Sequence, residues 1–207
     1  MTPLRLGVLI SGRGSNLLAI LEAIEHGELP AVVALVACNR PEVAGLAHAT
    51  SRGIPTLVAG RASYPSRADR HRAIADALTA TEVDLVVLAG WDEILIPEFI
   101  ARFDGRILNV HPSLLPAFAG TLHAQRDALA YGVKVSGCTV HLVTDDVDGG
   151  PIVLQRAVPV FEDDTPETLA ARILAEEHRA LPEAISLWAA GRVRAEGRRI
   201  RILPPPT

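Results

Sequence analysis

The feature that most constrains the fold is a series of short apolar segments that alternate with segments of helical pattern. Residues 4–10, 31–38 and 83–89 are almost entirely apolar, with helix-forming stretches between them. Strands that are apolar on both faces are typical of a parallel sheet covered by helices on both sides, joined by right-handed crossovers. The sequence therefore predicts an α/β fold with a doubly wound, mostly parallel sheet.

The finer pattern predicts the individual elements. Apolar runs predict strands at 4–10, 31–38, 56–58, 83–89, 106–110, 135–143 and 152–160. Periodicity predicts helices at about 17–24, 42–52, 67–80, 97–103, 122–131 and 166–190. Thr165 is the expected N-cap of the last helix, and an Arg-rich hairpin with a solvated face follows Gly191. The C-terminal part of the sheet is predicted to be mixed.

Composition excludes several classes of protein. The 207 residues carry 20 basic and 24 acidic side chains, so no net positive field would hold nucleic acid or an anionic membrane. The longest apolar run, 31–38, is far shorter than the ~20 residues of a membrane-spanning helix. No signal peptide is evident, and we expect a cytoplasmic protein. Cys38 and Cys138 lie in apolar surroundings and are expected to be buried, reduced thiols.

Candidate ligand-binding groups follow the strands, because ligands of open parallel sheets bind beyond the carboxyl ends of the strands. The loop 11–16 places Gly12 and Gly14 before Ser15 and Asn16 at a helix start, where free N–H groups favour an anion. The loop lacks the third glycine of a dinucleotide fingerprint and the Gly-Lys-Ser/Thr of a P-loop. A phosphate site and a plain tight turn both fit.

Two polar side chains end the strand at 106–110. Asn109 and His111 are two residues apart, so they share a face if the strand persists. An amide donor beside an imidazole suits acyl-type transfer, in which both could stabilise an oxyanion. The alternative is that both side chains simply satisfy backbone groups at the strand end. Pro112 and the residues after it are expected to stiffen the next loop.

The acidic turn 144–150 is the last candidate. Asp148 precedes Gly149-Gly150 and follows Asp145 and Asp146, a pattern that by itself fits a solvated loop as well as a site. Three histidines on predicted helices, His26, His48 and His71, are expected at the surface. No metal-ligand spacing appears, so no metal is expected.

Three stretches together resemble the phosphoribosylglycinamide formyltransferases, the folate-dependent enzymes of purine synthesis. They are residues 109–116, 132–141 and 147–151, and the resemblance runs from residue 8 to the hairpin after Gly191. It implies one formyltransferase catalytic domain over residues 1–207, with a nucleotide-phosphate-binding half (1–100) and a folate-binding and catalytic half (101–207). It also implies transfer of a formyl group from 10-formyltetrahydrofolate, as co-substrate, to the amine of glycinamide ribonucleotide.

The resemblance assigns roles to named residues. Asn109, His111 and Asp148 become the catalytic trio, in which Asn109 and protonated His111 stabilise the oxyanion and Asp148 supports the charge of His111. Substrate-binding residues are Gly14, Ser15, Asn16, Pro112 and Glu177. Folate-binding residues are Arg67, Glu93, Ile94, Leu95, Leu108, Asn109 and the loop Thr144, Asp145, Asp146, Val147 and Asp148. The implied partners are these small molecules, with the protein itself a monomer or homodimer.

Two places depart from the family pattern. The family commonly has Met-Arg or a similar pair after the fourth strand, where this chain has Asp92-Glu93. Recognition of the folate glutamate tail is therefore expected to be weaker or to rely on Arg67. The loop 118–123 is one residue longer than usual and lacks a proline, so its geometry is open.

Enzymes with related activities share the Asn, His and Asp residues of the catalytic trio. Formyltetrahydrofolate hydrolase and methionyl-tRNA formyltransferase carry additional domains for which this chain has no room on our interpretation. A non-catalytic folate- or nucleotide-binding module is the alternative from another class, and alanine substitutions in the trio would separate it from an enzyme.

Overall fold

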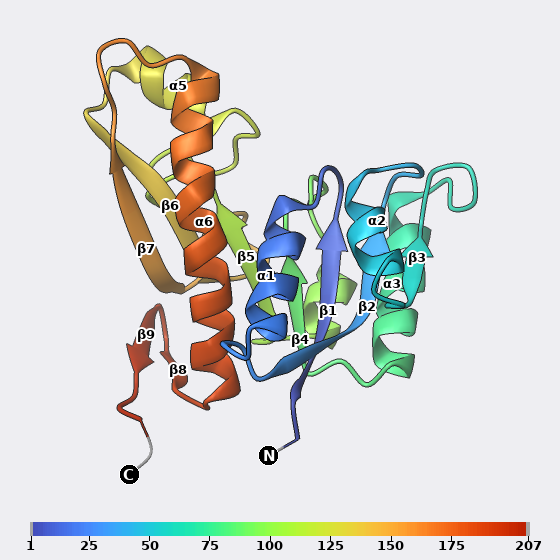
Figure 1. Cartoon of the computed structure of the whole chain (residues 1–207). Helices are drawn as coiled ribbons and strands as arrows, with labels where there is room; N and C mark the ends of the chain where they lie inside the picture. The colour runs from blue at the N-terminus through green and yellow to red at the C-terminus, as the bar shows by residue number, and fades with distance from the viewer. Residues whose placement is uncertain (1, 206–207) are drawn as a thin grey trace. The chain divides into compact units, whose positions relative to one another are not determined.

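The computed structural model describes residues 2–205, which divide into two compact units, Met1–Leu108 and Asn109–Thr207. Strand β5 (Ile107–His111) contributes its first two residues to one unit and its last three to the other. Each unit is described in turn, with the elements labelled in Figure 1.

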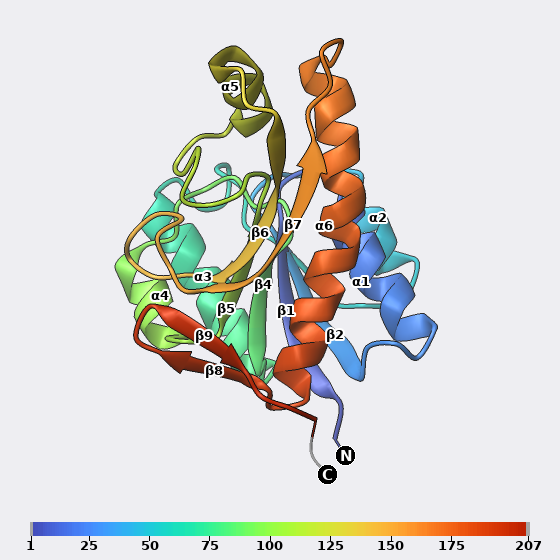
Figure 2. The same cartoon turned by 90° about the vertical axis from the view of Figure 1, so that its left-hand side faces the viewer.

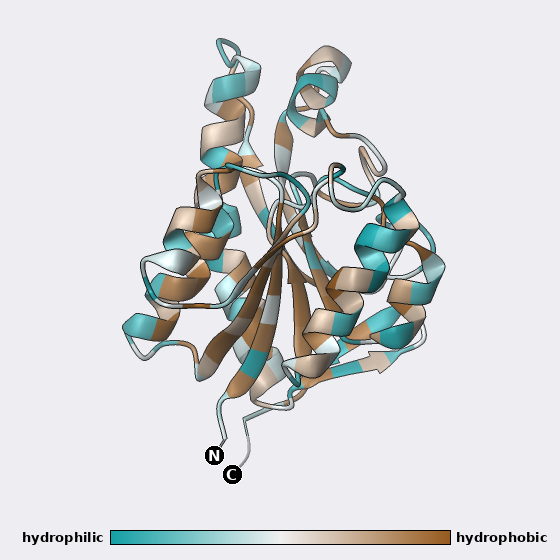
Figure 3. Ribbon diagram, turned by 90° about the vertical axis from the view of Figure 1, so that its right-hand side faces the viewer, coloured by the Kyte–Doolittle hydropathy of each residue, from teal (hydrophilic) through white to brown (hydrophobic). Residues whose placement is uncertain are grey.

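The first unit is built on parallel strands in the order β3-β2-β1-β4, with the start of β5 beside β4. Helices α1 and α2 cover one face of these strands and α3 and α4 the other (Figure 2). The strands between the helices are apolar on both faces (Figure 3), as a parallel sheet covered on both sides requires. The bounds are β1 Leu4–Ile10, α1 Ser15–Glu25, β2 Ala31–Cys38, α2 Gly45–Thr50, β3 Thr56–Val58, α3 Arg67–Ala80, β4 Leu85–Leu88 and α4 Pro97–Arg102.

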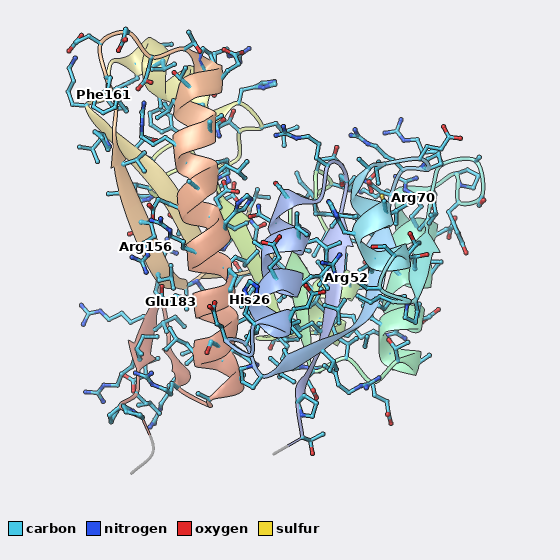
Figure 4. The ribbon with its side chains drawn as sticks, viewed as in Figure 1. His26, Arg52, Arg70, Arg156, Phe161 and Glu183 are labelled. Carbon is cyan, nitrogen blue, oxygen red and sulfur yellow. The ribbon has the colours of Figure 1, made fainter. Side chains whose placement is uncertain are left out.

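The second unit contains the strand order β5-β6-β7-β9-β8. β6 and β7 are antiparallel, β9 runs parallel to β7, and β8 and β9 form an antiparallel hairpin. Helix α6 packs on β6 and β7, and Arg156 of β7 forms an ion pair with Glu183 of α6 (Figure 4). The bounds are α5 Ala124–Tyr131, β6 Val135–Leu142, β7 Ile152–Pro159, α6 Pro166–Ala189, β8 Val193–Glu196 and β9 Arg199–Ile202.

These observations confirm the predicted fold class, including the mixed C-terminal strands. Thr165 caps α6 as predicted, in a capping box with Thr168. One helix was predicted too long: α2 covers only Gly45–Thr50. Glu42, the predicted start, has a φ of 58°, a left-handed conformation that a helix cannot include. Within residues 2–205, no helix combines the length and apolar character needed to cross a membrane.

The predicted state of the cysteines is confirmed. Cys38 and Cys138 are both free and buried. Burial raises the pKa of the Cys138 thiol to about 12, and burial also raises the pKa of Cys38. Neither thiol is therefore primed as a nucleophile, because the reactive form is the thiolate.

Candidate active site

The end of β5 presents two polar side chains to one polar cluster. Asn109 is half-buried and His111 is 6% exposed, while Val110 between them packs into the core. Asn109 and His111 are joined through two further residues, His141 and Asp148, as described next. The structure thus brings together all three residues of the predicted trio.

Both ring nitrogens of His111 face hydrogen-bond acceptors. Its Nε2 lies 2.9 Å from the carbonyl oxygen of Phe118, and its Nδ1 lies 3.3 Å from Oδ2 of Asp148. Both neighbours accept hydrogen bonds, so only a ring with a hydrogen on each nitrogen satisfies both. The ring of His111 is therefore held between a carbonyl oxygen and a carboxylate.

Asp148 occupies a constrained position in the turn between β6 and β7. Its backbone has a φ of 51°, and its Oδ2 accepts a 2.8 Å hydrogen bond from the N–H of Gly120. Burial raises the pKa of Asp148. Hydrogen bonds from His141 and Gly120 and the charge of His111 lower the pKa by more, so it lies below its usual value. Asp148 is therefore a carboxylate at neutral pH.

His141 is a member of the cluster that sequence reasoning missed. Its Nδ1 donates to the carbonyl of Leu142 at 2.9 Å, which leaves Nε2 facing Asn109 Nδ2 at 3.1 Å and Asp148 Oδ1 at 3.6 Å. Nε2 accepts from Asn109 when unprotonated and donates toward Asp148 when protonated. A signal for it exists in the sequence, because His141 lies near the end of the predicted strand 135–143.

A buried hydroxyl fixes the loop that follows His111. Thr139 Oγ1 on β6 donates to the Ser113 carbonyl at 2.7 Å and accepts from the Leu115 N–H at 3.0 Å. Gln155 Nε2 donates to Thr139 Oγ1 and to the Leu115 carbonyl. The expected rigidity of this loop, which begins at the half-buried Pro112, thus has a physical basis in hydrogen bonds to two neighbouring strands.

The acidic turn before Asp148 is open to solvent. Thr144, Asp145, Asp146 and Val147 are all exposed. The turn is closed by the Gly149 N–H, which donates to the Asp146 carbonyl at 2.9 Å. Arg198, between β8 and β9, donates to the Gly149 carbonyl at 2.7 Å. The turn is therefore fixed at its base, while the side chains predicted to cover the folate are accessible.

In the first unit, the loop 11–16 is a tightly packed turn. Gly14 is the N-cap of α1 with a φ of 74°, and a Cβ there would lie 2.6 Å from the Cα of Gly45. The Gly45 N–H donates to the Gly12 carbonyl at 3.1 Å. Only glycine fits at position 14, and it offers no side chain to cap the first-turn N–H groups of α1. Ser15 is half-buried and Asn16 is 6% exposed.

The remaining predicted folate residues of the first unit lie near the ends of α3, β4 and β5. Arg67 is exposed at the start of α3, Ile94 is 58% exposed, and Leu95 and Leu108 are buried. Glu93 is paired with Arg70 and His71. The expectation that His71 is a surface residue is wrong, since its side chain is fully buried. His26 is exposed and His48 half-buried.

Glu177, predicted to bind the ribose, lies on α6 and is only 7% exposed. A buried glutamate is uncommon, which argues against a plain solvated helix position. Within residues 2–205, no three His, Cys, Asp or Glu side chains are grouped as a metal site would need.

Residues 4–185 match the formyl transferase family. The chain belongs to the formyl transferase family. It is 43% identical to the phosphoribosylglycinamide formyltransferase of Haemophilus influenzae over 190 residues, 92% of this chain and 89% of that protein. It is 45% identical to the trifunctional purine biosynthetic protein adenosine-3 of Bos taurus, of whose length the chain spans only 19%.

Solved structures place this formyl transferase among the same proteins. Glycinamide ribonucleotide transformylase 1 from Symbiobacterium toebii has a TM-score of 0.95 and 54% identity, covering 98% of this chain and 95% of that one. A formyltetrahydrofolate deformylase from Pseudomonas syringae has a TM-score of 0.91 at 23% identity, covering 98% of this chain and 66% of that one. The second likeness shows the fold alone. The predicted resemblance is confirmed.

Proposed function

We propose that the chain transfers the formyl group of 10-formyltetrahydrofolate to the amine of N1-(5-phospho-D-ribosyl)glycinamide, a step of purine (IMP) biosynthesis. The observation that carries the proposal is the joined cluster of Asn109, His111 and Asp148, in a chain 43% identical over most of its length to a relative named for this activity. In the reaction the amine nitrogen bonds to the formyl carbon. The bond from that carbon to the folate nitrogen breaks, and a proton passes from the amine to the departing nitrogen.

The three residues have complementary roles in this proposal. The Asn109 amide and the His111 imidazolium stabilise the negative oxygen that develops on the formyl carbon. Asp148 stabilises the charge on His111 at 3.3 Å and can order a water for proton transfer. His141 supports both Asn109 and Asp148.

Five residues are assigned to the nucleotide. The uncapped first turn of α1 at Gly14, Ser15 and Asn16 suits a phosphate, because its N–H groups and the helix dipole attract an anion. Glu177 is assigned to the ribose hydroxyls, because a carboxylate can accept hydrogen bonds from them. Pro112 is assigned to the wall of the substrate site.

The folate is assigned to apolar and acidic groups. Ile94 leaves a large apolar side chain open to a flat ring, and the buried Leu95 and Leu108 are assigned to the same ring. The exposed residues 144–147 are assigned to the cover of the pterin. Arg67 is the exposed cation assigned to the glutamate tail.

The test is absorbance-monitored formyl transfer from a 10-formyl folate analogue, with and without the nucleotide. Release of the deformylated folate that requires the nucleotide supports the proposal. Release without the nucleotide would mean that water is the acceptor, as in a hydrolase. Tight folate binding with no release would indicate a binding module.

Variants connect the activity to the cluster. Asn109→Ala is expected to lower kcat by about 10² to 10³, the usual cost of losing one oxyanion donor, while the Kd for folate changes little. The control is Asp163→Asn, which alters an exposed carboxylate before α6. Its kcat should match that of the unaltered protein. Equal activity of both variants would contradict the proposal.

A further inference from the structure

The first unit contains a buried charged cluster that the proposed reaction does not use directly. Its members are Arg70 and His71 on α3 and Glu93 in the segment after β4, whose side chains are 4%, 0% and 15% exposed. Ionisable side chains are rarely buried in this way unless they are paired. Figure 4 labels Arg70 among the side chains of this unit.

Glu93 uses both carboxylate oxygens inside this cluster. Arg70 donates to Oε1 at 2.9 Å, and His71 Nε2 lies 3.1 Å from Oε2. The other terminal nitrogen of Arg70 donates to the carbonyls of Tyr64 and Pro65 at 3.0 and 3.3 Å. Glu93 is thus tied to α3, and Arg70 ties the pair to the turn before that helix.

The imidazole of His71 contacts the same segment at several points. The Ile96 N–H donates to Nδ1 at 3.2 Å, so the ring hydrogen is on Nε2, which donates to Glu93. The rings of Trp91 and Phe99 lie 5.9 and 6.1 Å away. Burial lowers the pKa of His71 against the opposing effect of Glu93, in keeping with a neutral ring.

The segment between β4 and α4 is held by side-chain contacts at both of its parts. Asp92 bonds to Ser11 and Asn39 and pairs with Arg40, whereas Glu93 and Ile96 are held by the cluster. Residues 91–96 form no helix or strand, and the backbone bonds to the neighbouring β1 side end at Ala89 and Gly90. They include Ile94 and Leu95, which we assign to the pterin. The acid at position 93 is matched by the bases at 70 and 71.

We propose that Arg70, His71 and Glu93 are positioning residues for the folate, holding residues 91–96 in the shape that accepts the pterin. The inference rests on the proposed function, since it concerns the site that we assign to the folate. It predicts that damage to the cluster weakens the use of folate and leaves the use of the nucleotide nearly unchanged.

Two variants test the inference in the full chain. His71→Phe keeps a ring beside Trp91 and Phe99 but removes both hydrogen bonds, and Glu93→Gln sets an amide N–H₂ against the His71 N–H. Both are expected to raise the KM for the folate on the order of tenfold, as small misplacements of positioning groups do, with the KM for the nucleotide unchanged. Arg72→Met is the control, because Arg72 is exposed on the same helix and pairs only with Asp69 among the described side chains.

Further measurements separate positioning from a general loss of structure. His71→Asn retains an acceptor for the Ile96 N–H and should recover part of the folate KM. In a Trp188→Phe background, Trp91 is the one remaining tryptophan, and its quenching by folate reports binding without turnover. An unchanged folate KM and quenching curve in both variants would overturn the inference. Parallel rises in both KM values with a lower Tm would also overturn it.

The same data keep the two proposals distinct. Failure of the unaltered protein to transfer formyl to the nucleotide would refute the proposed function. The quenching titration with folate would still decide whether the cluster positions this segment.

Discussion

Asp148 is the residue on which the polar contacts of the site converge, and His141 is its least expected partner. His141→Asn keeps a donor for the Leu142 carbonyl but removes the Nε2 that faces Asn109 and Asp148. Leaving such partners unsatisfied costs about 1–3 kcal/mol. We expect kcat to fall about tenfold, a smaller loss than for Asn109→Ala. Steady-state kinetics at several pH values measure this fall in kcat, with the exposed His26→Asn as the control. An unchanged kcat in His141→Asn would contradict this role.

The lowered pKa of Asp148 makes a prediction about stability in acid. Its folded-state pKa lies below the ~3.9 of an unfolded aspartate, so the carboxylate stabilises the fold above that value. This contribution is lost as the pH falls through the folded-state pKa. Urea unfolding should therefore show a stability difference between the unaltered protein and Asp148→Asn that shrinks from pH 5 to pH 3. Asp163→Asn should show no comparable trend, and a difference of the same size at pH 5 and pH 3 would refute the assignment.

At the scale of elements, the turn between β6 and β7 is held by close backbone approach. A Cβ on Gly150 would lie 1.8 Å from the Leu142 carbonyl oxygen, which is backbone and cannot move aside. Gly150→Ala should therefore displace the turn that carries Asp148, lowering both kcat and stability, the latter by about 1–3 kcal/mol as for other overpacked sites. Activity assays and thermal unfolding measure both effects. Gly60→Ala, whose Cβ would meet only Pro41 at 3.6 Å, is the control; equal behaviour of the two variants would refute the argument.

Elements with purely local causes were predictable from the sequence. The bounds of β1, β2, β3 and α3 coincide with the prediction, because apolar runs and helical periodicity are read directly along the chain. The start of α2 was not predictable in this way, since Glu42 adopts a left-handed conformation in a stretch of ordinary helical composition.

The residues that the sequence did not reveal have distant partners. His71 is buried because Glu93 and Ile96 bond to it from 22 and 25 positions away. His141 joins the site through Asn109, 32 positions away. By contrast, Asn109, His111 and Asp148 were candidates because they lie at strand ends and turns, and the family resemblance then assigned them together. Side-chain contacts between separate elements are set by tertiary packing, which no local pattern encodes.

At the scale of the whole molecule, ligands that bind only the folded chain must stabilise it by mass action. At 100 times its Kd, a ligand adds about 2.7 kcal/mol. The nucleotide and the folate analogue are therefore each expected to raise the Tm, and inorganic phosphate much less than the nucleotide.

Glu177 provides the discriminating variant for this effect. Because we assign Glu177 to the ribose, Glu177→Gln should reduce the Tm shift caused by the nucleotide and leave the shift caused by the folate intact. Thermal unfolding followed by circular dichroism, with each ligand alone and with both, measures the two shifts. An equal loss of both shifts would mean that the buried Glu177 supports the fold of α6 and does not recognise the nucleotide.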